Sequence, residues 1–270
     1  MREILIAHEC PNCIFEEVRQ HTNYLYALVH LLEENETYRN NFLNAKLQGS
    51  KIILDNSIFE LGEAFDSSKY VSWIQRLEPD EYIVPDSLEN AAETIWKFFN
   101  FTRNNPKLPG KKIGVLQGKS YDELCNCYKA LVELGAEKIA ISFDYSFFKE
   151  SYQHQNFSKW EEFMLGRIQF IDLLIRESFF KEKIPLHLLG CSLPQEFKHY
   201  SSFKKGIIES VDTSNPIVHG LFRIPYTSKG TLDSKETKKL CDLIDSEVDS
   251  HQKSVIFSNI YSFKENLKIF

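Results

Sequence analysis

Short apolar, β-branched runs that each end on a polar residue recur along this 270-residue chain and limit the folds open to it. Such runs are typical of buried strands, and the residue after each run lies at one end of a sheet. Helical patterns separate the runs, which predicts a parallel sheet. We expect strands at 4–7, 51–54, 81–84, 112–116, 138–142, 185–189 and 207–212, with an eighth at either 217–222 or 254–257.

The segments between these runs have the apolar spacing of helices. We expect helices at 15–34, 66–77, 87–100, 120–134, 158–180 and 233–248, and a loop or frayed helix at 35–50. Either a (β/α)8 barrel or a doubly wound open sheet suits this alternation. Polar residues end many of the strands, and no Gly-rich dinucleotide turn follows the first, which favours the barrel. We therefore predict an α/β fold, a (β/α)8 TIM-like barrel with insertions, as one domain over residues 1–270.

The amino-acid composition limits the classes of binding partner that we expect for this chain. The chain has 32 basic and 38 acidic residues, a net charge of −6, so nucleic acid would have to bind a local basic patch. The candidate patch comprises Lys204, Lys205, Arg223 and Lys229. Six irregularly spaced Cys, no secretory leader and no long apolar run predict a cytoplasmic protein with thiols and no membrane contact. The oligomeric state stays open.

Three acidic residues follow predicted strands and are the candidate catalytic groups. Asp55, Asp86 and Asp212 each end an apolar run, and Gln117 ends a fourth. Two carboxylates that face each other across a cleft are what glycosidic-bond chemistry uses. Each also has a structural interpretation, because Asp86 with Glu89 forms a capping box and the other two begin turns.

A possible metal site lies after the first strand. His8, Cys10 and Cys13 form an H-x-C-x-x-C cluster whose C-x-x-C spacing suits zinc. A strong zinc signal needs a second pair of ligands, so buried thiols are the favoured interpretation. No cofactor is required for the chemistry expected of the carboxylates.

Several segments, in order between residues 51 and 223, resemble the tRNA-guanine transglycosylases. Residues 54–59 (L-D-N-S-I-F) resemble that family's T-D-S-G-G-F, and residues 113–118 (I-G-V-L-Q-G) resemble its G-I-V-Q-G-G. Residues 188–196 are similar to L-M-G-V-G-T-P-E-D, and residues 219–222 to N-G-x-L-F. Asp86 and Asp212 fall where the family has its base-recognition Asp and its nucleophilic Asp.

The resemblance implies a role for each matching residue. Asp212 would attack C1′ of a guanosine, expel guanine and form a covalent glycosyl-enzyme, and Asp55 would be the general base for the incoming 7-deazaguanine. Asp86 and Gln117 would recognise the edge of the base. The other residues implied to form the purine slot are Gly118, Ser142, Gly190 and Phe59, and the aromatic run 143–148 could stack on an extruded base.

Differences from the family's motifs decide whether DNA or tRNA is the expected substrate. The C-terminal zinc module of the tRNA enzymes has no counterpart here, because Cys241 is the only Cys after residue 191. The chain therefore looks more like the short phage-type branch, which exchanges guanine in DNA for a 7-deazaguanine such as preQ0. That assignment places the protein in the cytoplasm of an infected host cell.

Other functions remain open at this stage. One alternative is a tRNA-guanine transglycosylase that acts on tRNA, and another is a non-catalytic barrel that binds nucleic acid or a purine. A retaining glycoside hydrolase that uses Asp55 and Asp212 is a third. The chain lacks the Trp-rich sugar platform expected of that enzyme, since its 3 Trp lie on or beside predicted helices.

Overall fold

Eight parallel strands alternate with helices, which is a (β/α)8 TIM-like fold of the α/β class. The computed structural model describes residues 4–153, 155–191 and 193–268, without the side chains of residues 201 and 202. Ser192, within the segment compared with the transglycosylases, lies outside this range. The strand order in the sheet is β1-β8-β7-β6-β5-β4-β3-β2. The predicted fold class is confirmed.

The chain divides into two compact units, and each is discontinuous in sequence. Unit 1 contains residues 1–22, 143–180 and 188–270, and unit 2 contains residues 23–142 and 181–187. The prediction of one domain over residues 1–270 stays a prediction.

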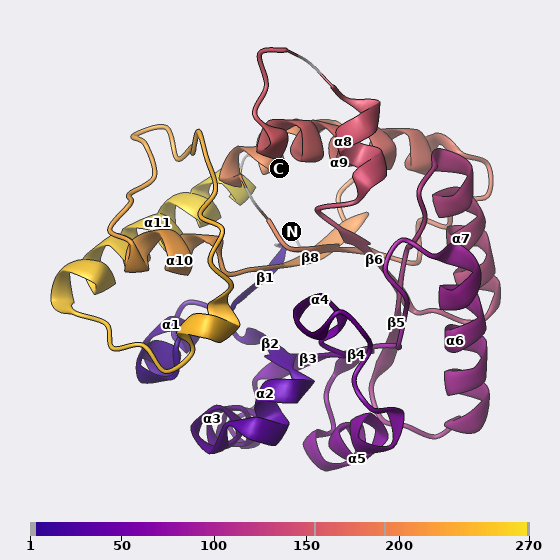
Figure 1. The fold of residues 1–270 in the computed structure, drawn as a ribbon, viewed down its shortest axis with the longest axis horizontal. Helices are drawn as coiled ribbons and strands as arrows, with labels where there is room; N and C mark the ends of the chain where they lie inside the picture. Colours follow the sequence, from indigo (N-terminus) through magenta and orange to yellow (C-terminus); the bar gives the residue numbers. More distant parts are fainter. Residues whose placement is uncertain (1–3, 154, 192, 269–270) are drawn as a thin grey trace. The chain divides into compact units, whose positions relative to one another are not determined.

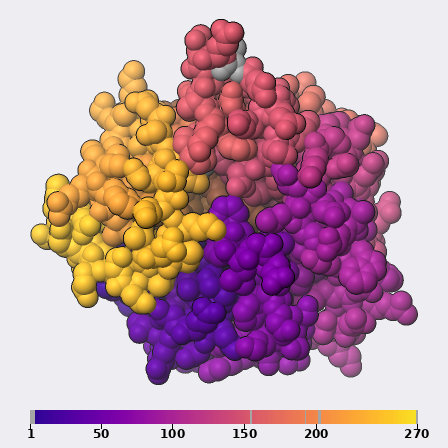
Figure 2. Space-filling view, viewed as in Figure 1, coloured from indigo at the N-terminus to yellow at the C-terminus, as the bar shows by residue number. Residues whose placement is uncertain are grey.

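Unit 2 contains the consecutive strands from β2 to the first half of β7. Its strands are β2 (Tyr24–Leu28), β3 (Lys51–Asp55), β4 (Glu81–Ile83), β5 (Lys111–Val115), β6 (Lys138–Ser142) and the first half of β7 (Leu186–Leu189). Its helices are α2 (Val29–Glu34), α3 (Glu36–Leu47), α4 (Ile58–Leu61), α5 (Ser67–Leu77), α6 (Ala91–Asn104) and α7 (Tyr121–Glu133). Helices α6 and α7 lie side by side outside β4 and β5 (Figure 1). The atoms of residues 23–142, indigo to magenta in Figure 2, form a closely packed surface on the face shown.

Unit 1 brings together the two ends of the chain and the segment around residue 160. It contains β1 (Leu5–His8), α1 (Phe15–Arg19), α8 (Ser146–Ser151), α9 (Lys159–Arg176), β8 (Ile208–Thr213), α10 (Asn215–Leu221) and α11 (Ser250–Lys268). Three short 3-10 helices are η1 (Asn12–Ile14), η2 (Pro194–Ser202) and η3 (Leu240–Leu243). Strand β1 pairs with β8, with Ala7 opposite Asp212 and His8 opposite Thr213. Helix α10 packs on α11, and α8 packs on α9 (Figure 1).

A buried ion pair lies at the start of the strands of unit 2. Lys138 Nζ is 2.7 Å from Glu81 Oε2, and the Tyr24 hydroxyl donates a hydrogen bond of 2.6 Å to the same oxygen. These residues begin β6, β4 and β2, and the Lys138 and Glu81 side chains are 0% and 8% exposed. Because the carboxylate and the ammonium are matched, the pair can occupy the core without an uncompensated charge.

Three predicted elements are wrong. The helix expected at 15–34 is interrupted by β2, where all five residues are buried. A fully apolar run has the same pattern in a buried strand and in a buried helix, so periodicity does not separate them. Segments 217–222 and 254–257 lie in α10 and α11 rather than in an eighth strand, and 207–212 is therefore the eighth strand itself. Residues 233–248 contain only η3, whereas 36–47 form the full helix α3.

Within the described part of the chain, every helix is too short or too polar to cross a bilayer.

Candidate functional site

The sequence places Asp55 as the last residue of β3, and a tight turn then fixes its side chain. Ser57 has a left-handed backbone (φ 60°) and its N–H donates to Asp55 Oδ2 at 2.7 Å. The Tyr26 hydroxyl donates a second hydrogen bond to the carboxyl. Burial raises the pKa of Asp55 well above its usual value, the negative charges of Glu60 and Asp86 add to the increase, and these two donors oppose it.

Asp86 lies three residues beyond β4, where two side-chain amides hold it. Asn56 Nδ2 donates to Asp86 Oδ1 at 2.8 Å, and Gln117 Nε2 donates to Oδ2 at 2.7 Å. Burial raises the pKa of Asp86, and the hydrogen bonds from Asn56 and Gln117 oppose the increase. Lys97 Nζ bonds the Asp86 backbone carbonyl at 2.9 Å rather than the carboxylate.

Backbone groups fix which way both amides point. The Asn56 carbonyl oxygen accepts from the Ile58 N–H at 3.0 Å, and the Gln117 carbonyl oxygen accepts from the Glu89 N–H at 2.7 Å. Since a backbone N–H can only donate, each amide must turn its NH2 group toward Asp86. Asp86 thus receives a hydrogen-bond donor at each carboxyl oxygen. Gln117 has both ends occupied, so it positions Asp86 instead of offering a free amide to a ligand.

The carboxyls of Asp55 and Asp86 differ from those of Glu81 and Glu196, which are also buried. Glu81 and Glu196 each pair with a buried cation. Across the described residues, neither Asp55 nor Asp86 forms an ion pair, although they are 7% and 1% exposed. Buried acids without a cation are rare in purely structural positions, because desolvation is then offset only by hydrogen bonds. This pair is therefore a candidate for chemistry.

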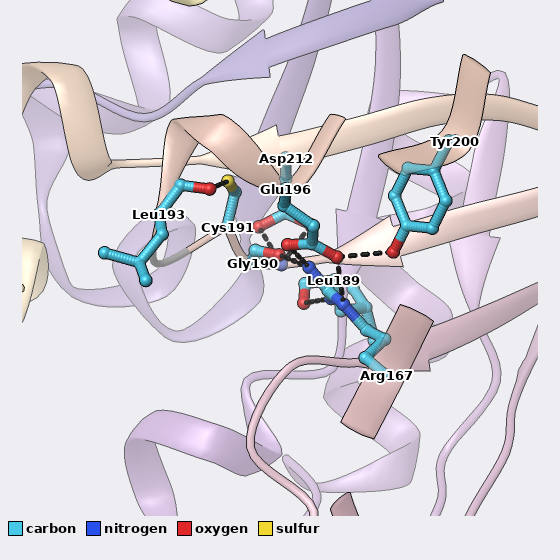
Figure 3. Close-up of polar contacts among 8 residues, drawn as sticks. All are labelled: Arg167, Leu189, Gly190, Cys191, Leu193, Glu196, Tyr200 and Asp212. Carbon is cyan, nitrogen blue, oxygen red and sulfur yellow. Dashed lines mark hydrogen bonds and ion pairs between the residues drawn. The ribbon is translucent and has the colours of Figure 1, made fainter. Parts of the chain in front are cut away.

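Asp212 of β8 belongs to unit 1 and has its own surroundings. The Gly190 N–H points at both carboxylate oxygens, at 3.1 and 3.2 Å (Figure 3). Gly190 adopts φ +66°, which favours glycine, and this conformation turns its N–H to the acid. The catalytic role of Asp212, and whether it faces Asp55, stay predictions.

A buried arginine fixes the Gly190 segment. Arg167 of α9 forms a bidentate pair with Glu196, with Nε to Oε1 at 2.8 Å and Nη2 to Oε2 at 2.7 Å (Figure 3). Its remaining donors reach the carbonyls of Leu189 and Gly190, both at 2.9 Å. The Tyr200 hydroxyl completes the network by donating to Glu196 Oε1 at 2.5 Å. This network was not among the sequence predictions. One signal for it was the position of Arg167, a charged residue on the apolar face of α9, which it shares with Met164, Phe170, Ile171 and Leu174.

The remaining predicted slot residues serve several structural purposes. A Cβ on Gly118 would lie 2.8 Å from Glu123 Cβ, so glycine is needed there for the approach of α7. Phe59 is 50% exposed on α4, and Ser142 ends β6 half-buried. In the aromatic run, Phe143, Tyr145 and Phe148 are at most 4% exposed and pack in the interior of unit 1. These three rings are core residues.

The basic residues predicted to hold nucleic acid all lie at the surface. Lys204, Lys205 and Lys229 are exposed. Arg223 is paired with Asp249, with Nη2 2.6 Å from Oδ2, so part of the charge of the patch is already neutralised. Binding of DNA or tRNA through these residues stays a prediction.

The zinc site predicted at His8, Cys10 and Cys13 is not supported. In the described ranges, no three His, Cys, Asp or Glu side chains are arranged to hold a metal ion. Burial raises the pKa of the Cys10 thiol, and the charges of Glu9 and Cys13 add to the increase. Cys13 Sγ donates to the Ser246 carbonyl at 3.1 Å.

His8 itself is buried beside the Phe263 ring, with ring centroids 6.0 Å apart. Burial first, and then the charges of Lys264 and His21, lower the pKa of His8 to about 3, while the Thr213 backbone offsets little of this. Neither ring nitrogen makes a hydrogen bond of normal geometry within the part of the chain described. The folded protein therefore holds this imidazole neutral.

We expect acid to destabilise the protein through His8. Unfolding restores a pKa near 6.5, so the unfolded chain takes up a proton that the folded chain excludes. The contribution of His8 to stability is complete above about pH 6.5 and is lost as the pH falls toward 3, about 2 kcal/mol by pH 5. His8→Leu should remove this loss, as measured by urea midpoints at pH 7.5 and 5. His251→Leu replaces an exposed histidine and should keep the wild-type difference; an unchanged difference in His8→Leu would contradict the assignment.

Comparison with known proteins does not support the transglycosylase resemblance. No known protein family and no curated protein matches the sequence. Solved structures of similar fold include phosphonopyruvate hydrolase, with 12% identity, 78% of this chain and 75% of that chain covered and a TM-score of 0.45. Another is 2,3-dimethylmalate lyase of the PEP mutase/isocitrate lyase superfamily, with 10% identity, coverage of 78% and 73% and a TM-score of 0.46. Likeness at this level carries no inference about substrate.

These findings overturn the assignment to the transglycosylases and the functions that rest on it. Exchange of guanine in DNA, its phage context, the tRNA alternative and the purine-binding barrel are all withdrawn, because no known protein family and no curated protein supports the resemblance on which they rest. What remains is a (β/α)8 TIM-like chain with two buried carboxyls at strand ends of unit 2, which form no ion pair among the described residues, and a positioned carboxylate in unit 1.

Proposed function

We propose that the chain is an enzyme that transfers protons to and from a small polar substrate at the C-terminal ends of β3, β4 and β5. Asp55 is the proton donor and acceptor, and Asp86 is the carboxylate that receives N–H or O–H groups of the substrate. One observation carries the proposal: two buried carboxyls that form no ion pair among the described residues lie at neighbouring strand ends and have different hydrogen-bond donors. Such pairs divide acid and base roles in enzymes.

The surroundings of Asp55 suit a group that both gives and takes a proton. The protonated form is favoured by burial and by the charges of Glu60 and Asp86. When the proton leaves, the Ser57 N–H and the Tyr26 O–H remain as donors to the new carboxylate. Asp86, fixed between two amides, keeps lone pairs for a ligand and changes little during the reaction.

The test uses turnover by the full chain. Wild-type protein is incubated in D2O with mixtures of small polar metabolites, and consumption or deuterium exchange is followed by proton NMR. We expect Asp55→Asn to lower the rate about 10²–10⁴-fold, the usual effect of losing a general acid or base. Asp86→Asn should mainly raise KM. Asp66→Asn, which changes the exposed cap of α5 in the same unit, should keep wild-type turnover.

A second measurement does not depend on the substrate. Carbon-13 NMR of Asp carboxyls should show Asp55 titrating far above Asp66, because the Ser68 hydroxyl and the Lys69 N–H lower the pKa of Asp66. Activity that requires protonated Asp55 should fall as the pH rises through this titration. Full turnover by Asp55→Asn, or a titration of Asp55 at the position of Asp66, would refute the proposal.

A further inference from the structure

A lysine in unit 1 lies against two aromatic rings and has no hydrogen-bond acceptor among the residues that the structure describes. Lys235 belongs to the irregular segment before η3, and its Nζ lies 5.1 Å from the centre of the Trp160 ring and 5.9 Å from that of Phe143. Trp160 comes from the first turn of α9, and Phe143 directly follows β6. Three separate segments of the fold therefore meet at this amine.

The amine of Lys235 has three donors to satisfy. It makes neither a hydrogen bond nor an ion pair with any residue in the described ranges, although the side chain is half-buried. The charged groups around it are Asp144 and Glu9, which favour the ammonium, and Arg167, which opposes it; burial is the largest influence and lowers the pKa of Lys235. Rings stabilise a cation but accept no strong hydrogen bond.

The two rings beside the amine both contact a third ring, that of Phe163. The ring centroids of Phe143 and Phe163 are 5.9 Å apart, and those of Trp160 and Phe163 are 6.3 Å apart. The guanidinium of Arg167 covers Phe143 with Cζ 4.8 Å from the ring centre, but its charge is already matched by Glu196. Lys159 Nζ also lies 4.4 Å from the Trp160 ring centre, but that side chain is exposed, so Lys235 is the half-buried lysine of this cluster without an acceptor among the described residues.

We propose that Lys235, Trp160 and Phe163 form a binding site for a small organic anion, with a carboxylate or phosphate on the Lys235 ammonium and an apolar body against the two partly exposed rings. The anion supplies the acceptors that the amine lacks, and the rings bury the body of the ligand. The site uses neither Asp55 nor Asp86, so its test is independent of the test of the proposed acid–base function.

The test follows the reactivity of Lys235 in the intact chain. Formaldehyde with cyanoborohydride methylates neutral amines: the amine adds to the carbonyl, water leaves, and hydride reduces the imine. Peptide mass spectrometry then gives the labelling rate of Lys235, with exposed Lys205 and Lys229 as internal references. Benzoate and phenyl phosphate are the two anionic probes, benzamide is the matched neutral body, and acetate is the matched charge without a body.

We expect benzoate, phenyl phosphate or both to slow methylation of Lys235 about tenfold at saturation, while Lys205 and Lys229 keep their rates. The stronger of the two protectors identifies the anionic group. Benzamide and acetate should protect far less at the same concentration, and Trp160→Leu should shift the midpoint of protection several-fold upward. Equal rates with and without both anions would refute the site, and so would equal protection by benzamide, because the ammonium would then play no part.

Discussion

Arg167→Met should destabilise the protein by about 3–5 kcal/mol, because it leaves a buried carboxylate without its cation. Glu196 has a fully buried side chain, and the carbonyls of Leu189 and Gly190 would lose a donor as well. Urea unfolding followed by circular dichroism measures the loss. Arg167→Lys should recover little of it, since a single ammonium cannot reproduce the bidentate geometry.

The same helix offers a matched control for that measurement. Arg176 forms an exposed pair with Asp172, where the arginine side chain is 71% exposed. Arg176→Met should therefore change stability by less than about 0.5 kcal/mol. If both variants unfold at the same urea concentration, the Arg167 network does not hold the Gly190 segment in the way described.

Lys138→Met should have an effect of similar size in unit 2, about 3–5 kcal/mol, because Glu81 would remain charged in the core. Adding Glu81→Gln should restore most of the stability. The double variant carries no buried charge, and the glutamine oxygen still accepts the Tyr24 hydroxyl that now bonds Glu81. The measurement is a double-mutant cycle from urea midpoints of the wild type, both single variants and the double variant.

An exposed ion pair in unit 2 provides a reference for this double-mutant cycle. Lys69 and Glu33 are 2.9 Å apart, with side chains 58% and 35% exposed. Lys69→Met should cost less than about 1 kcal/mol. Additive effects of Lys138→Met and Glu81→Gln, with no recovery in the double variant, would show that the two groups do not compensate each other.

Local patterns were sufficient to predict much of the fold. Alternating apolar runs and helical segments gave the fold class, and the polar residues at their ends located Asp55, Asp86, Gln117 and Asp212 near the strand termini. Strand β2 was missed because residues buried on both faces carry no period of two. The helix predicted at 233–248 failed because an apolar spacing guarantees no helix where tertiary contacts favour irregular chain.

The candidate site was only partly predictable, because its supporting groups act across the sequence. Asn56 and Gln117 meet at Asp86 from separate strand ends, and Arg167 reaches Glu196 from another helix. Such pairings depend on tertiary structure. The transglycosylase resemblance failed for a related reason: an acid, a small polar residue and a glycine after a strand are common turn chemistry in this fold class, so short matches in order indicate the architecture rather than the reaction.

The pairing of β1 with β8 has a consequence for synthesis of the protein. Leu5 lies opposite Ser210, so roughly 200 residues must leave the ribosome before the first strand meets this neighbour. Strands β2 to β6 pair in sequence order and can associate as they emerge. The nascent chain thus exposes the apolar strand β1 until β8 has emerged, and chaperones that bind extended apolar segments would find their target there.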